Sequence, residues 1–324
     1  EETSEPEALH KQASELLPSI LMGIFVLVTF VVLFGLLRDQ QGRFQGLYQY
    51  VLSDLTFQRA IVAANQNQAQ QTYDLQNLAI NTFSQRDSYH RVFSQTNLAL
   101  ANLLATQART QATAGGINQQ DSQTIITLVQ QSINFGRNAV TLSPLNVLNW
   151  ENLTNVYRAL IGFAQNADQF AIASARQATA LDPTNPLLRV SLGGIYYQLA
   201  QYDLAIAEFA TAINLKNDFA NAHYNLGHAY EAKGDLVNAL ASYQAVRNLV
   251  PSDSEDFKRI EAEIAAVQQK LPGATPPPQP EAAAPAPSQE PLQISTPSGV
   301  LPTQKPPIKV EGPPPPATTS AEQE

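Results

Sequence analysis

One internal repeat constrains the fold of this chain more than any other feature of its sequence. The segments Leu187–Phe219 and Asn221–Asp253 align with a shift of 34 residues. A tandem period of this length, with apolar residues at helical spacing, predicts pairs of amphipathic helices that bury their apolar faces only by stacking. The coinciding positions are small or aromatic: Leu192, Gly193, Tyr196, Ala205 and Phe209 in one copy, and Leu226, Gly227, Tyr230, Ala239 and Tyr243 in the other.

Glycine positions indicate how each helix pair is built. Gly234 lies in the turn between two predicted helices and suits the left-handed conformation that often ends a helix. Gly193 and Gly227 carry no side chain, so we expect each to let the partner helix approach closely at Ala205 or Ala239. We expect the aromatic positions of the repeat to fill the space between neighbouring copies.

The period and the residue order, Leu-Gly-x-x-Tyr followed by Ala, an aromatic residue, Ala and Pro, resemble the tetratricopeptide repeat family. Arg189 and His223 stand where that family usually has Trp. The resemblance implies an all-α solenoid of helical hairpins whose first helices line a concave binding surface. We therefore predict repeats at 146–184, 186–219 and 220–253, within a region that covers 146–251.

The copy at 146–184 has Trp150 in the Trp position and about five extra residues in Ile161–Asp168, which we place in the turn between its two helices. Upstream, residues 38–145 are rich in Gln, Asn and Ala and are interrupted by Ala114-Gly115-Gly116. We interpret this stretch as a helical stalk of degenerate hairpins. Its four expected helices are Tyr48–Ala64, a second that starts near Tyr73 and ends near Arg86-Asp87, Tyr89–Ala105 and Ile125–Val140.

Downstream of the repeats, residues 252–271 are amphipathic and charged, as expected of the helix that caps a solenoid. Ser252 or Ser254 is the expected N-cap. Residues 272–324 are dominated by Pro, Ala, Thr, Gln and Glu. Such a composition buries too little apolar area to offset the entropy of the chain, and it predicts a disordered tail.

Near its start the chain has an uncharged apolar run, Leu16–Leu37, preceded by a polar segment at 1–15. As a helix, these 22 residues would reach about 33 Å, enough to cross a hydrocarbon core of about 30 Å. The run predicts a single transmembrane helix at 16–37 and the lipid bilayer as one partner. Arg38 and Arg43 follow it and, by the positive-inside rule, favour a cytoplasmic repeat region.

The composition excludes several classes of function. There is no cysteine, so no disulfide or thiol nucleophile is possible, and the net charge of -9 argues against nucleic acid as a partner. The four His residues are too scattered for a metal site. We find no catalytic constellation and no phosphate-binding loop, and we expect no cofactor, no metal and no enzymatic activity in this chain.

The resemblance implies a binding surface lined by the first helix of each repeat. On this surface Asn152, Ser191 and Asn225 occupy equivalent positions and resemble the asparagine ladders that hold a peptide backbone. The Lys/Arg clamp that other members of the family use is absent. The expected partner is a protein or peptide in this groove. The candidate residues are Asn152, Asn155, Arg158, Ser191, Tyr197, Tyr224, Asn225, His228 and Glu231.

Two functions remain open. The first is a membrane-anchored, non-catalytic scaffold that binds protein or peptide partners. The alternative rests on a span, a Gln-rich stalk and repeats that resemble the C-terminal part of bacterial O-antigen ligases and polymerases. Residue 1 is Glu rather than Met, which favours a fragment of such a polytopic glycan-assembly protein. That resemblance implies an extracytoplasmic repeat domain, opposite to the orientation that the arginines favour.

Overall fold

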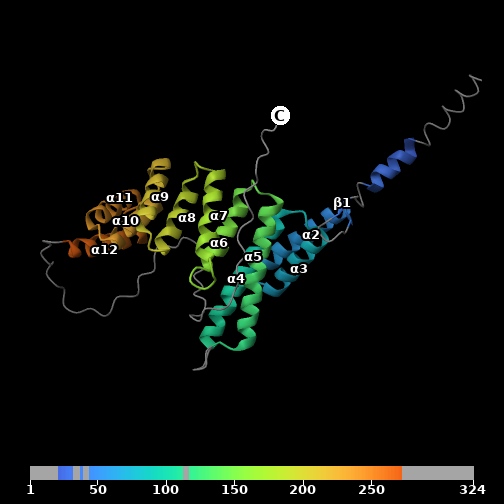
Figure 1. Cartoon of the computed structure of the whole chain (residues 1–324), viewed down its shortest axis with the longest axis horizontal. Helices are drawn as coiled ribbons and strands as arrows, with labels where there is room; N and C mark the ends of the chain where they lie inside the picture. Colours follow the sequence, from blue (N-terminus) through green and yellow to red (C-terminus); the bar gives the residue numbers. More distant parts are fainter. Residues whose placement is uncertain (1–20, 32–36, 39–43, 112–116, 272–324) are drawn as a thin grey trace, which may run out of the picture. The chain divides into compact units, whose positions relative to one another are not determined.

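The computed structural model describes residues 21–31, 37–38, 44–111 and 117–271, and nearly all of them are helical (Figure 1). The chain divides into two compact units, Glu1–Phe93 and Ser94–Glu324. The helices are α2 Leu47–Asn65, α3 Ala69–Thr82, α4 Asp87–Gln111, α5 Gln119–Leu142, α6 Val147–Ala159, α7 Ala167–Leu181, α8 Pro186–Gln198, α9 Tyr202–Leu215, α10 Ala220–Lys233, α11 Leu236–Leu249 and α12 Glu255–Lys270.

The first unit contains the α2–α3 hairpin and the start of α4. Strands β1 (Leu37–Arg38) and β2 (Phe44–Gln45) form a short antiparallel pair before it. Asp54 of α2 accepts a 2.5 Å hydrogen bond from Arg86, whose guanidinium also lies over the ring of Tyr89. Phe57 stacks on Tyr89 at 4.3 Å between ring centroids. These contacts tie the start of α4 to α2.

Part of the predicted membrane span falls outside the described residues, at 16–20 and 32–36. Residues 21–31 are helical and expose their large apolar side chains. Leu37, which we expected to end the span, instead pairs with Gln45 in the short sheet. Within the described ranges, no helix has both the length and the apolar character needed to cross a bilayer. The segments 1–15, Ala114–Gly116 and 272–324 also lie outside the described residues.

The second unit is a stack of helical hairpins, as the repeat predicts. In Figure 1, α6 to α12 follow one another in sequence order along this unit. The two helices of each pair α6–α7, α8–α9 and α10–α11 pack together, and α7, α9 and α11 each pack against the next first helix or the cap. A core of buried side chains therefore runs through the stack from α4 to α10, and a second cluster joins α10, α11 and α12.

Local sequence explains where these helices begin and end. Asn146 and Asn185 cap α6 and α8 by accepting a hydrogen bond from the backbone two residues on. Gly234 ends α10 in the left-handed conformation with φ of 88°. Ser254 caps α12 and accepts from the Phe257 N–H. Leu160–Asn166, between α6 and α7, is the longest of the three turns within these hairpins.

The contact at the repeat glycines differs from the expected one. A Cβ built on Gly193 would lie 2.6 Å from Cε1 of Phe209, and one built on Gly227 would meet the ring of Tyr243 even more closely. The close approach expected at Gly193 and Gly227 is present, but the atoms that meet each glycine belong to Phe209 or Tyr243 of the same hairpin rather than to Ala205 or Ala239. Each ring lies on the glycine of its own hairpin, because only a bare Cα leaves room for it.

A recurring hydrogen bond marks the start of first helices. Trp150 Nε1 donates to the carbonyl of Pro144, six residues earlier, at 2.7 Å. His223 Nε2 makes the same contact with Asn217 at 3.0 Å, and His90 Nε2 with Ser84 at 2.8 Å. A carbonyl only accepts, so both imidazoles must donate here. Each of these residues is the fourth of its helix, so the start of α4 has the same hydrogen bond as the starts of α6 and α10.

Candidate functional site

The predicted binding residues come from three first helices that adjoin one another. Helix α8 contacts α10, and Arg158 of α6 reaches Gly194 and Gln198 of α8. We call the surface that these three helices share the first-helix face. Its accessible members among the predicted residues are Asn155, Arg158, Ser191, Tyr197, Asn225, His228 and Glu231, of which Asn155 and Tyr197 are exposed and the others partly so.

Asn152 does not lie on this accessible face, which corrects the sequence prediction. Its side chain is only 2% exposed, and its amide donates to the Ser94 hydroxyl at 3.0 Å. Ser94 donates in turn to the Ser132 carbonyl at 2.7 Å, and Ser132 donates to the Ser94 carbonyl at 2.8 Å. Asn152 therefore joins α6 to α4 and α5, because the preceding hairpin covers its position.

The expected polar line is not continuous for a second reason. Asn225 is partly exposed, but its amide donates within α10 to the carbonyl and side-chain oxygens of Asn221, at 2.7 and 2.6 Å. Tyr224, also predicted to face the groove, is 2% exposed and packs on His228 with 4.4 Å between ring centroids. The residues that remain available for a partner are concentrated around Arg158 and Tyr197.

Tyr197 is the large aromatic group of the first-helix face. It is 38% exposed and lies 5.8 Å from Tyr202, measured between ring centroids. Burial of the rest of its ring raises its pKa, with smaller contributions from Tyr202 and Glu231. Tyr197 is therefore a neutral, rigid side chain with one surface open, of the kind that often anchors protein interfaces.

A chain of hydrogen bonds links the predicted residues of α10 to the capping helix. Lys270 of α12 donates to Glu231 at 2.7 Å, and the hydroxyl of Tyr243 donates to the other oxygen of Glu231 at 2.9 Å. His228 Nδ1 lies 3.0 Å from the same hydroxyl. Burial alone would raise the pKa of Glu231, but the bonds from Lys270 and Tyr243 outweigh it and hold the pKa below its ordinary value.

These hydrogen bonds determine which ring nitrogen of His228 carries the proton. The single hydroxyl proton of Tyr243 goes to the Glu231 carboxylate, so Nδ1 of His228 must be the donor to Tyr243. Nε2 then carries a lone pair, and this atom is buried without a hydrogen-bond partner. Burial lowers the pKa of His228, because a second proton would place a charge and an unpaired N–H in this space. His228 and Glu231 thus help attach the cap.

Across the described ranges, no group of three or more His, Asp or Glu side chains is arranged to hold a metal ion. A shallow hollow at the start of α5 is lined by Gln119, Gln120, Gln123 and Thr124, and it contains none of the predicted site residues.

Sequence reasoning missed three contributors to this surface. Gln198 receives the Arg158 hydrogen bond, Tyr243 connects His228 to Glu231, and Lys270 pairs with Glu231. Tyr243 could have been found, because it lies 34 residues after Phe209 in the repeat. Lys270 had no such signal, since it lies 39 residues from its partner in a helix outside the repeat period.

Stacked helical hairpins with an accessible first-helix face define a class of helical repeat protein. Comparison with known proteins gives the kind of repeat. Residues 193–234 match a model described as TPR repeat, and residues 222–255 match one described as tetratricopeptide repeat. The chain therefore carries tetratricopeptide repeats in this segment.

Three known proteins are similar to parts of this chain. The probable UDP-N-acetylglucosamine–peptide N-acetylglucosaminyltransferase SEC of Arabidopsis thaliana is 39% identical over 62 residues, which are 18% of this chain and 6% of that protein. PilW, a type IV pilus biogenesis factor, matches with a TM-score of 0.48 and 15% identity, over 69% of this chain and 89% of its own. YrrB, a TPR protein described as having an unusual peptide-binding site, matches with a TM-score of 0.45 and 14% identity, over 67% and 91%.

Proposed function

We propose that this chain is a non-catalytic scaffold that binds a protein or peptide partner on its first-helix face. The observation that carries the proposal is the exposed Tyr197 on α8, the helix that Arg158 of α6 contacts at Gly194 and Gln198. Backbone-rigid helices hold these groups in place, which limits the entropy lost when a partner binds. The buried Asn152 and Tyr224 support this surface from below and do not contact the partner.

Site-specific photocrosslinking in the native host tests this function. Benzoylphenylalanine at position 197 should give a covalent adduct with one discrete partner. The same group at position 237 is the matched control, since Val237 is 68% exposed on the second helix of the last hairpin. Equal adducts from both positions, or adducts from position 237 alone, would place binding elsewhere and contradict the proposal.

The same proposal includes a membrane anchor at Leu16–Leu37, supported by its uncharged apolar sequence. Full-length protein should stay in the pellet after carbonate extraction, whereas deletion of residues 16–37 should release it. Recovery of the full-length protein in the supernatant would show that the segment is no anchor. The resemblance to O-antigen ligases and polymerases stays a prediction from sequence.

We further propose an extracytoplasmic repeat region, following that resemblance. The chain has no cysteine, so Lys258→Cys gives a single reporter site for an impermeant maleimide. Labelling of intact cells would support this orientation, and labelling only after lysis would support the opposite one, which Arg38 and Arg43 favour.

A further inference from the structure

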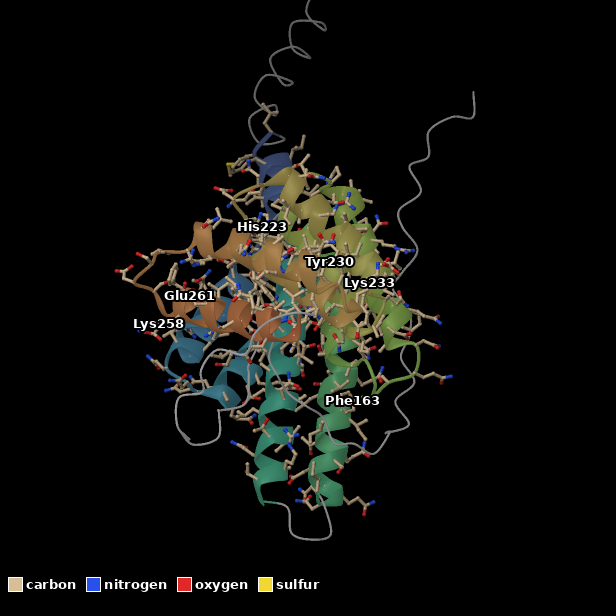
Figure 2. All side chains as sticks on the ribbon, turned by 90° about the vertical axis from the view of Figure 1, so that its left-hand side faces the viewer. Phe163, His223, Tyr230, Lys233, Lys258 and Glu261 are labelled. Carbon is tan, nitrogen blue, oxygen red and sulfur yellow. The ribbon has the colours of Figure 1, made fainter. Side chains whose placement is uncertain are left out.

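Arg158 has no acidic partner among the described residues, unlike Arg189 and Arg247 of the same hairpin stack. Arg189 pairs with Glu208 at 3.1 Å and Arg247 with Glu261 at 2.8 Å, and Lys258 and Glu261 are labelled on α12 in Figure 2. For Arg158, the described part of the chain offers a single 3.4 Å hydrogen bond, from Nε to the side-chain oxygen of Gln198. Burial alone lowers its pKa, and no carboxylate opposes that effect.

The guanidinium of Arg158 is held in a defined position by the absence of a side chain at Gly194. A Cβ at Gly194 would lie 3.1 Å from Nη2 and 3.5 Å from both Cζ and Nη1. These similar distances place the plane of the guanidinium against the backbone of α8. One face is therefore covered, while Nε is directed at Gln198. The N–H groups of Nη1 and Nη2 remain for another acceptor.

We propose that Arg158 binds the carboxylate of an Asp or Glu side chain in an extended peptide on the first-helix face. This inference rests on the function proposed above and specifies the chemistry of its partner. Two parallel N–H groups match the two oxygens of a carboxylate, and partial withdrawal from water strengthens the pair. Asn155 precedes Arg158 by three residues in α6, and Tyr197 follows Gly194 by three residues in α8, so each lies on the same helix face as its neighbour and both are exposed.

A carboxylate fits the charge of this position better than a phosphate does. The contacts at Gly194 bring one cationic group to this position, the guanidinium of Arg158. A phosphoryl group carries up to two negative charges at neutral pH and usually collects several cationic donors. A single partly buried guanidinium therefore matches one monovalent acid.

Selection of peptides on the full-length protein in detergent tests this inference without a known partner. A phage-displayed library of random 12-residue peptides is selected on the wild type, on Arg158→Gln and on Lys258→Gln. Lys258→Gln removes the same charge from exposed α12. We expect the wild type and Lys258→Gln to enrich peptides with Asp or Glu at one fixed place, and Arg158→Gln to lose that preference.

Synthetic amidated peptides then give a double-mutant comparison by fluorescence anisotropy. Replacing the selected acid by its amide should weaken binding to the wild type about tenfold to a hundredfold. The same replacement should weaken binding to Arg158→Gln less than about twofold. If Arg158→Gln does not fold, Arg158→Lys takes its place, because an ammonium keeps the charge but not the bidentate fit.

Three results would overturn the inference. The enriched peptides could lack a preference for Asp or Glu. Replacing the selected acid by its amide could weaken binding equally to the wild type and to Arg158→Gln. A phosphoserine peptide could bind more tightly than the acidic peptide. Any of these leaves peptide binding itself intact. Failure of the wild type to enrich any peptide would instead remove the proposed function, and this inference with it.

Discussion

Phe209 lies directly on the Cα of Gly193, so that the first atom of any side chain at position 193 would enter the ring. Tyr243 and Gly227 repeat this contact 34 residues later. An aromatic ring therefore packs the two helices of the α8–α9 hairpin and of the α10–α11 hairpin against each other.

The Gly193–Phe209 contact predicts non-additive effects on stability. In an open helix position Gly→Ala stabilises by up to about 1 kcal/mol, but overlap with the ring should reverse the sign and cost about 1–3 kcal/mol. Phe209→Leu should relieve part of that cost. Urea unfolding of both single variants and the double variant measures the coupling, and strictly additive free energies would refute the contact.

Asn152 and Asn155 should respond very differently to the same truncation. Asn152→Ala removes a buried hydrogen bond to Ser94 and leaves a small cavity, which should cost roughly 1–3 kcal/mol of stability. Asn155 is exposed on the same helix, so Asn155→Ala should stay within about 0.5 kcal/mol. Thermal unfolding midpoints of the two variants test this difference, and equal midpoints would show that Asn152 is not buried as described.

The capping helix should stabilise the last hairpin through Ile260. This side chain is fully buried against α10 and α11, and Ile260→Ala should cost about 2–5 kcal/mol. Lys258→Ala, on the exposed side of the same helix, is the matched control and should be nearly neutral. A chemical denaturation midpoint that is unchanged by Ile260→Ala would mean that α12 does not cap the stack.

Mild acid should weaken the repeat stack through His228. Burial holds its pKa in the folded state below the ordinary value of 6.5, so the unfolded chain takes up the proton first and stability falls as pH drops below that value. Glu231, whose pKa is also lowered, adds a loss at more acidic pH. Unfolding midpoints at pH 7.5 and 5.5 should differ less in His228→Gln than in the wild type. His223→Gln serves as control, and an identical pH dependence in all three proteins would argue against this account.

Sequence pattern was enough for the elements whose causes are local. The 34-residue shift located the hairpins, Gly234 marked a left-handed helix end, and Ser254 was one of two expected caps. Burial of Asn152 could not be read in the same way, because it depends on Ser94 and Ser132 in a preceding hairpin without a visible repeat.

The candidate site also combines features that the local sequence predicts with one that depends on distant residues. Periodicity was enough to place Arg158 and Tyr197 on first helices. The unpaired state of Arg158 required knowing that no acidic side chain from another helix reaches it, which is a property of the assembled stack.

The hydrogen bond that Trp150, His223 and His90 each make to a carbonyl six residues earlier has an evolutionary consequence. These three helix starts accept a ring N–H from either an indole or an imidazole, whereas the fourth residue of α8 is Arg189, which pairs with Glu208. Replacement of Trp by His can therefore erase the sequence signature of the repeat while keeping this hydrogen bond. A search for such repeats should accept either donor at this position.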